Sequence, residues 1–221
     1  MGNLCNEWKE YLGGEFEKDY FKKLKEFLRN ESERGKRIYP ESRNVFNAFN
    51  SCHPKDVKVV IVGQDPYINE GEAMGLCFSV PEGKRLPPSL QNIFKEIEDE
   101  TGIKNKRGDL TAWSKQGVML LNSLLTVEEG KPLSHAGKGW EQFFNAVMKV
   151  LNEHFAQLIF VLWGRNAQRC EALLDKDKHI ILKSSHPSPL GANAGFFGCG
   201  HFNEINRILK ERGEAEISWQ T

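Results

Sequence analysis

Four short runs of apolar, mostly β-branched residues constrain the fold of this chain more than any other feature. They are Val57–Val62, Val118–Leu121, Leu158–Leu162 and Ile180–Leu182. Stretches with apolar residues at helical spacing separate or follow them, at Ser89–Glu100, Leu110–Lys115, Trp140–Phe155, Asn166–Leu174 and Phe202–Arg212. Both faces of each run are apolar, as in a parallel sheet covered by helices on both sides. The pattern predicts an α/β three-layer sandwich around a central, short, mainly parallel sheet of four strands.

The segment before the first run places apolar and aromatic residues at helical spacing among charged ones. These residues are Leu4, Trp8, Leu12, Phe16, Tyr20, Leu24 and Phe27. Their spacing predicts an amphipathic helical segment over residues 1–30, either one helix or two broken at Gly13-Gly14, packed on the remainder. Because the chain contains no internal repeat, low-complexity tract or linker, we expect residues 1–221 to form a single domain.

The charged residues balance, with 30 Lys and Arg against 30 Asp and Glu. This neutrality counts mildly against binding to nucleic acid, because such proteins are often basic overall. It leaves room for a local basic face, and for phosphate contacts made by backbone N–H groups and hydroxyls.

The five cysteines are odd in number and form no C-x-x-C pair: Cys5, Cys52, Cys77, Cys170 and Cys199. This argues against a disulfide framework, a zinc site and an iron–sulfur cluster, so we expect no metal and no cofactor. Free thiols without a signal peptide predict an intracellular protein, nuclear or mitochondrial in a eukaryote and cytoplasmic in a bacterium. No apolar run approaches the ~20 residues that cross a bilayer.

Polar residues follow the ends of three of the apolar runs. Asp65 comes after the first run, Asn122 directly after the second, and His186 shortly after the fourth. In open α/β sheets the ligand crevice lies outside the carboxyl ends of the strands. We therefore expect these three side chains to converge on one cleft.

Several reaction classes do not fit this cleft. The chain has neither the G-x-S-x-G motif of serine hydrolases nor a P-loop, and no G-x-G-x-x-G motif follows the first strand. Most glycoside hydrolases use two carboxylates, whereas the strand ends supply one. A single carboxylate with a histidine suits departure of an anionic nucleobase from a cation-like sugar.

Five motifs occur in order along the chain. They are Gly63-Gln64-Asp65-Pro66-Tyr67, Gly75-Leu76-Cys77-Phe78-Ser79-Val80, Pro87-Pro88-Ser89-Leu90, Leu120-Leu121-Asn122-Ser123-Leu124-Leu125-Thr126, and His186-Pro187-Ser188-Pro189-Leu190 with Gly195-Phe196-Phe197-Gly198-Cys199 and His201-Phe202. They resemble the water-activating region, the proline-rich loop, the uracil-reading strand end and the DNA-intercalating loop of family 1 uracil-DNA glycosylases. The similarity runs from Tyr39 to Trp219, and five ordered motifs are far more specific than one.

The resemblance implies a role for each residue around the base. Asp65 would orient the attacking water and offset positive charge on the deoxyribose, and His186 would donate to uracil O2 as it gains charge. Asn122 would read uracil N3–H and O4, a pattern opposite to that of cytosine. Tyr67 would exclude the thymine methyl group and Phe78 would stack on the base. Gln64 would contribute mainly backbone contacts near O2.

The resemblance also implies a mode of DNA binding. Ser89 and Ser188 would bind phosphates beside the flipped nucleotide, with Pro87 and Gly164 in the same DNA-binding loops, and Leu190 would enter the duplex as a wedge. Lys84, Arg85, Arg165, Arg169 and Lys183 are candidates for added local positive charge, although solvated surface charge is their ordinary role. The expected partner is uracil-containing DNA, single- or double-stranded. We expect the protein to be a monomer and not to bind a membrane. Nothing in the residues identifies a replication or repair protein as a further partner.

The chain departs from the family pattern at four positions. Ile68 stands where the family usually has histidine, Gly191 and Arg165 stand where serine is common, and Met74 replaces a residue that is more often polar. These changes remove a polar group beside the catalytic loop and exchange a phosphate-binding hydroxyl for a cation. With Asp65, Asn122 and His186 all in place we expect activity to survive.

Three alternatives stay open on the residues alone. A related glycosylase would act on another damaged base, which Tyr67 and Asn122 disfavour. A catalytically silent DNA-binding module would keep the fold as a scaffold, and release of free uracil would exclude it. A flavodoxin-like nucleotide-binding protein would share the fold and would carry a tightly bound ligand.

Overall fold

A four-stranded parallel sheet forms the centre of the molecule in the computed structural model, which describes residues 2–221. Its strands are β2 (Val59–Gly63), β3 (Val118–Asn122), β5 (Ile159–Trp163) and β6 (Ile180–Ser184). Their order across the sheet is β3-β2-β5-β6. The register sets Gly63 opposite Asn122 and Trp163 opposite Ser184, so all four strands end at one edge. The predicted three-layer α/β sandwich is confirmed.

The strands differ in how completely they are covered. Every residue of β2, β3 and β5 is buried, as expected from their apolar sequences. β6 is only half-buried and its Lys183 is exposed. β3 is the other edge strand of the sheet and is fully buried, so an edge position alone does not cause this exposure. The expectation of full cover on both faces therefore holds for three strands and fails for the fourth.

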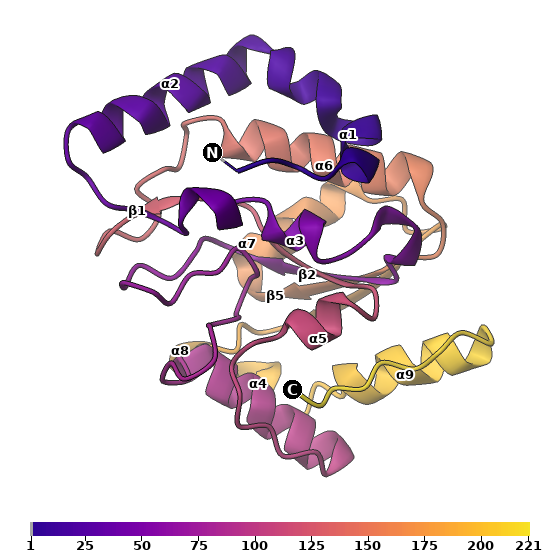
Figure 1. Ribbon diagram of the computed structural model, residues 1–221. Helices are drawn as coiled ribbons and strands as arrows, with labels where there is room; N and C mark the ends of the chain where they lie inside the picture. Colours follow the sequence, from indigo (N-terminus) through magenta and orange to yellow (C-terminus); the bar gives the residue numbers. More distant parts are fainter. Residues whose placement is uncertain (1) are drawn as a thin grey trace.

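Helices lie on both faces of this sheet (Figure 1). One face carries α1 (Asn6–Leu12), α2 (Asp19–Glu33), α3 (Asn47–Asn50) and α6 (Trp140–His154). The other carries α4 (Pro88–Thr101), α5 (Thr111–Ser114) and α9 (His201–Glu211). The short helices α7 (Gly164–Gln168) and α8 (Pro189–Gly191) follow β5 and β6 at the carboxyl edge. Short helical turns occupy Gly13–Glu17 (η1), Ser42–Asn44 (η2), Pro54–Asp56 (η3), Arg169–Leu173 (η4) and Ala192–Phe196 (η5).

The amino-terminal helices are held to the core by aromatic contacts. Trp8 is fully buried, its ring stacks on Phe155 with centroids 5.9 Å apart, and its Nε1 donates to the carbonyl of Cys52 at 2.9 Å. The η1 turn between α1 and α2 begins at Gly13. Within residues 2–221 no helix is both long and apolar enough to cross a membrane.

A second, two-stranded sheet was not predicted from the sequence. It pairs β1 (Ile38–Tyr39) with β4 (Val127–Glu128) in antiparallel orientation. Two-residue strands are too short to show a period-2 pattern, which explains why the sequence gives no signal for them. This ribbon leads into the loop of residues 129–134, which reaches the carboxyl edge of the main sheet.

Candidate active site

The polar residues at the strand ends line one cavity of about 260 Å³. Its walls include Gln64, Asp65, Tyr67, Phe78, Ser89, Asn122 and His186. A neighbouring hollow of about 380 Å³ shares Gln64 and His186 and adds Gly164, Arg165 and Ser188. A larger cavity of about 810 Å³ lies between α2 and the β1 region, away from this constellation. We place the site in the smaller cavity because the convergent titratable and amide groups are there.

Asn122 lies at the end of β3, directly beside the end of β2. A Cβ atom on Gly63 would come within 2.2 Å of Asn122 Oδ1 and 2.5 Å of the Cβ of Cys77, so only glycine leaves room for the amide. Asn122 is 7% exposed, and its amide has no hydrogen-bond partner among the side-chain contacts of the described residues. Because Asn122 lines the cavity, its amide can pair with a ligand bound there.

Asp65 is held through one of its two carboxylate oxygens. Oδ2 accepts a hydrogen bond from the backbone N–H of Leu133 at 2.7 Å. Burial raises the pKa of Asp65 above its ordinary value, and hydrogen bonds from backbone N–H groups partly oppose this. The N–H of Asp65 itself is the second backbone donor to this carboxylate, which lines the cavity wall.

His186 is held in a defined tautomer. The backbone N–H of Ser188 donates to its Nδ1 at 3.0 Å, so Nδ1 is the acceptor and the ring proton resides on Nε2. Burial lowers the pKa of His186 below its ordinary value. Both effects favour a neutral imidazole that offers an N–H donor from Nε2.

Aromatic residues form one wall of the cavity. Phe78 has a positive φ of 63°, unusual for a residue other than glycine, and its ring lies 5.6 Å from Trp163 and 5.9 Å from His186 between centroids. The Tyr67 hydroxyl donates to the carbonyl of Phe78 at 3.0 Å. Burial raises the pKa of Tyr67, so this hydroxyl keeps its proton. Backbone strain of this kind persists where the surroundings impose it, commonly at functional sites.

Gln64 can offer its backbone N–H to the site, because its carbonyl and its side-chain oxygen are both occupied. Its side-chain Oε1 accepts from Nδ2 of Asn166 at 2.7 Å. Its carbonyl accepts from the backbone N–H of Leu124 and from the hydroxyl of Ser123, both at 2.9 Å. These contacts join the end of β2 to the segment after β3 and fix the two halves of the cavity.

The loop after His186 projects from the protein. Leu190 is 96% exposed, in α8 beside Pro189. A Cβ atom on Gly191 would lie 2.3 Å from the carbonyl oxygen of His186, so serine does not fit there in this backbone conformation. Glycine at this position is therefore required by the close approach of the two chain segments.

Two of the four departures change the cavity wall. Ile68 and Met74 both line the cavity and make this part of it apolar. The carbonyl of Ile68 accepts from the N–H of Gly130 at 3.0 Å, which ties it to the 129–134 loop. The same loop also carries the Leu133 N–H that binds Asp65, so it contacts both Ile68 and Asp65 through backbone atoms.

The 129–134 loop was missed by sequence reasoning. Leu133 has a positive φ of 60°, and Pro132 lines the cavity. The contact to Asp65 uses a backbone N–H, so the Leu133 side chain gives no sign of it. The only available signal is the Gly130-Lys131-Pro132 turn, which is common in loops of any function.

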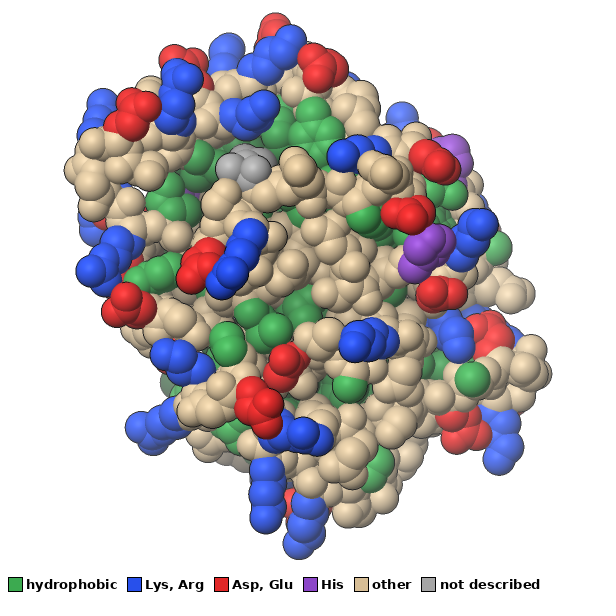
Figure 2. Space-filling model, viewed as in Figure 1, with side chains coloured by type: hydrophobic (Ala, Val, Ile, Leu, Met, Phe, Trp, Pro, Cys, Tyr) green, Lys and Arg blue, Asp and Glu red, His purple; other side chains and the backbone are tan. Residues whose placement is uncertain are grey.

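The candidate cations differ in their availability. Lys183 binds Glu171 with Nζ–oxygen distances of 3.0 and 2.9 Å, and Lys84 Nζ donates to the carbonyl of Glu70 at 3.3 Å. Arg165 is exposed beside the second hollow and forms no salt bridge within residues 2–221. On the face shown in Figure 2, acidic and basic side chains are interspersed. Arg165 is thus the candidate cation best placed to meet a phosphate.

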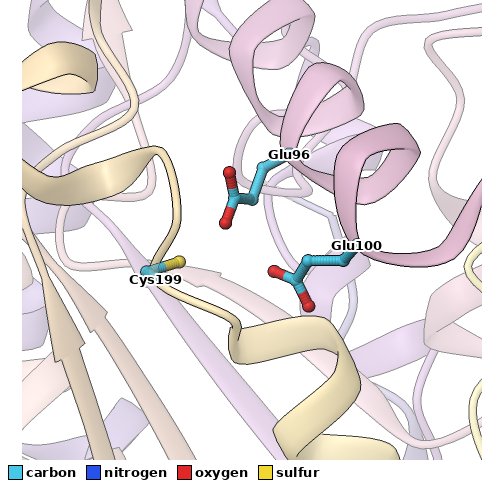
Figure 3. Close-up of side chains that lie close together, drawn as sticks. All are labelled: Glu96, Glu100 and Cys199. Atoms are coloured by element: carbon cyan, nitrogen blue, oxygen red, sulfur yellow. The ribbon is translucent and has the colours of Figure 1, made fainter.

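One group of potential metal ligands exists among the described residues, away from the cavity. It consists of Glu96, Glu100 and Cys199, whose ligand atoms lie within 4.8 Å of one another (Figure 3). Both oxygens of Glu96 already accept backbone hydrogen bonds, from Gly198 at 2.9 Å and Gly200 at 3.3 Å. Burial and the two acidic neighbours raise the pKa of Cys199 to about 12, so its thiol stays protonated. The group therefore suits hydrogen bonding better than metal binding.

Comparison with known proteins agrees with this geometry. The model of the Uracil DNA glycosylase superfamily matches residues 49–210. Uracil-DNA glycosylase of Agrobacterium fabrum is 50% identical over 218 residues, covering 98% of this chain and 90% of the relative. That of Fusobacterium nucleatum is 51% identical over 221 residues, covering 100% and 97%.

Solved structures extend the likeness to the whole fold. The crystal structure of mimivirus uracil-DNA glycosylase has a TM-score of 0.93 at 33% identity, covering 99% of this chain and 88% of that chain. The family model, the two relatives and this structure all match the segment that carries Asp65, Asn122 and His186. The chain belongs to the uracil DNA glycosylase superfamily.

Proposed function

We propose that this protein hydrolyses the N-glycosidic bond of deoxyuridine in single- and double-stranded DNA, releasing uracil and leaving an abasic site. One observation carries the proposal: Asp65, Asn122 and His186 come from three strand ends and line one cavity of about 260 Å³. A base stacked inside a duplex cannot reach groups that line a cavity, so the nucleotide would leave the helix before reaction. Membership of the superfamily supports this choice of substrate.

Asp65 would assist the attack of water on the sugar. Its Oδ2 is fixed by the Leu133 N–H, which leaves Oδ1 to orient a water toward C1′. As the bond between C1′ and N1 breaks, positive charge develops on the deoxyribose and the carboxylate stabilises it. The water oxygen then bonds to C1′, and the proton it loses passes to Asp65.

His186 would stabilise the leaving group. Uracil departs with its electron pair as an anion delocalised over N1 and O2. A neutral imidazole with its proton on Nε2 donates a hydrogen bond to O2 as the charge appears. Because Ser188 fixes the tautomer in advance, the donor does not need to reorganise during the reaction.

Asn122, Phe78 and Tyr67 would select uracil. The buried Asn122 amide pairs with N3–H and O4, and cytosine would leave both groups unpaired at about 1–3 kcal/mol each. Phe78 would stack on the base beside Trp163. Tyr67, anchored by its hydroxyl to the Phe78 carbonyl, would stand against C5 and exclude a methyl group.

Backbone and hydroxyl groups would hold the DNA. Ser89, in the first turn of α4 after Pro87, lines the base cavity, and Ser188 and Gly164 line the adjoining hollow. Phosphate contacts of this kind need no net positive charge, which is consistent with the neutrality of the chain. We propose that a monomer binds in this way, without metal or cofactor.

The deciding experiment measures free uracil released from a uracil-containing oligonucleotide with EDTA present. Matched oligonucleotides with thymine, cytosine or hypoxanthine at the same position are the controls. We expect release from uracil alone. Release of hypoxanthine or mismatched thymine instead would identify a glycosylase for another base, and no release of any base would contradict the proposal.

The wedge role of Leu190 gives a prediction about duplex DNA. Leu190→Ala should slow uracil release from a duplex more than from a single strand, because only the duplex contains a vacancy to fill. Single-turnover rates on the duplex and single-stranded forms of one oligonucleotide measure the effect. We expect the ratio of the duplex rate to the single-strand rate to fall about tenfold. Leu173→Ala removes another exposed leucine and is the matched control, since Leu173 lines neither the cavity nor the adjoining hollow. Equal losses on both substrates would count against the wedge.

Arg165 gives a prediction about salt dependence. Arg165→Ser should weaken binding to uracil-containing and undamaged DNA alike, and should reduce the slope of log Kd against log salt by about 1. Lys183→Ser is the control, because Lys183 is already paired with Glu171. Fluorescence anisotropy between 50 and 200 mM salt would measure both slopes. An unchanged slope for Arg165→Ser would place this cation away from the phosphates.

A further inference from the structure

One face of α4 carries four polar residues at helical spacing. Ser89, Asn92, Glu96 and Glu100 follow one another at intervals of three and four residues, which places them along a single stripe. Ser89 lines the base cavity. The other three side chains form hydrogen bonds to one remote segment, residues 187–203.

These hydrogen bonds follow the segment along the length of the helix. Asn92 Nδ2 donates to the carbonyl of Pro187 at 2.7 Å. Glu96 accepts from the backbone N–H groups of Gly198 and Gly200, and Glu100 Oε2 accepts from that of Asn203 at 2.7 Å. The contact points advance from residue 187 to residue 203 as the helix advances from residue 92 to residue 100.

Glu96 is buried in an unusual way for a carboxylate. It is 1% exposed, and no Lys, Arg or His of the described chain forms a salt bridge with it. Figure 3 shows Glu96 and Glu100 pointing from α4 toward the turn that carries Cys199. A buried carboxylate is tolerated when hydrogen-bond donors surround it. Here the donors are the backbone N–H groups of a turn that follows the projecting loop.

We propose that Asn92 and Glu96 are positioning residues that hold the 186–200 loop on α4, so that His186 faces the base and Leu190 faces the duplex. This inference rests on the proposed function. Asn92 binds the residue next to His186, and Glu96 binds the far end of the loop, beyond Leu190. The two contacts bracket the groups that meet the nucleotide. Ser89 lies on the same face of α4, at the end of the helix that lines the base cavity. A shift of the loop along α4 would therefore move His186 and Leu190 relative to Ser89.

The two contacts predict different defects. Asn92→Ala frees the carbonyl next to His186, so it should lower the single-turnover rate on single-stranded and duplex DNA alike, by about tenfold or more. Glu96→Gln keeps the shape of the side chain but removes one acceptor from the far end of the loop. It should reduce the duplex rate relative to the single-strand rate, as Leu190→Ala does.

The control is Glu98→Gln on the same helix. Glu98 is exposed and binds Lys104 at 3.1 Å, away from the loop, so its loss should leave both rates unchanged. Thermal unfolding of each variant shows that it is folded at the assay temperature. If Glu96→Gln does not fold, Glu96→Asp keeps the charge, withdraws the carboxylate from the N–H groups of Gly198 and Gly200, and should give the same duplex-selective loss.

A second readout does not depend on activity. NMR titration of the free protein gives the pKa of His186, which burial holds below its ordinary value in the native protein. In Asn92→Ala the loosened loop admits water, and this pKa should rise toward its ordinary value. Native rates together with a native His186 pKa in both folded variants would overturn the positioning role. Failure of the unmutated protein to release uracil would instead overturn the proposed function and leave the NMR result standing.

Discussion

Asp65→Asn should lose most of the turnover of this protein while retaining its affinity for uracil-containing DNA. The substitution preserves shape but removes the negative charge that, in the proposed mechanism, orients water and offsets charge on the sugar. Loss of a general base of this kind costs about 10²–10⁴-fold in rate. Binding should persist because the proposed base and phosphate contacts come from Asn122, Phe78, Ser89 and Ser188, which line the two hollows.

The pH dependence of the rate tests the same role. Burial raises the pKa of Asp65 above its ordinary value of 3.8, so the active carboxylate is lost as pH falls through this raised pKa. Below it, the rate should fall about tenfold for each pH unit. In Asp65→Asn no carboxylate titrates there, and this acid limb should disappear.

Single-turnover rates between pH 4 and 9, with DNA affinity measured in parallel, check both statements. Asp109→Asn is a suitable control because Asp109 bonds to Thr111 and does not line the cavity. An Asp65→Asn variant that turns over at the native rate would remove the carboxylate from the mechanism.

The sequence predicted the three central side chains because parallel strands share one edge. Asp65, Asn122 and His186 each follow a strand-like run, and the carboxyl ends of parallel strands meet. The strand assignments alone were enough to predict that these three side chains lie close together. Their individual roles needed the family resemblance, because the same three groups are compatible with several reactions.

The supporting contacts were not predictable because they involve backbone atoms. The Leu133 N–H that holds Asp65 is 68 residues away in the chain and would be present with almost any side chain. The carbonyl of Pro187 and the N–H of Gly198, which α4 holds, are equally invisible in the sequence. Glu96 and Asn92 resemble the ordinary polar residues of an amphipathic helix until the fold brings the loop beside them.

The space around Gly191 shows another limit of sequence comparison. Serine is common at this position in the family, so the sequence alone suggests only that Gly191 lacks a hydroxyl group. The structure gives a positive reason for glycine, because a Cβ atom would collide with the carbonyl of His186. The change from serine to glycine at this position therefore goes together with a backbone that passes close to His186.

His186→Leu should lower the rate by about 10²–10³-fold, with little change in DNA affinity. Removal of one donor to a developing oxyanion has about this cost, and it acts on the transition state more than on the bound substrate. His186→Gln retains an N–H donor and should recover part of the loss. Single-turnover rates of the two variants therefore separate a donor role from a role in packing against Phe78.

The charge state of His186 gives the stricter test of this role. Its lowered pKa means that the ring is neutral at pH 7 and gains a proton only as pH falls through a value below 6.5. Protonation would also place a proton on Nδ1, against the N–H of Ser188 that now donates to it. ¹⁵N NMR should therefore show one neutral tautomer, with the proton on Nε2, from pH 6.5 to 9. An imidazolium at pH 7 would mean that a full positive charge, and not a preorganised neutral donor, meets the departing uracil.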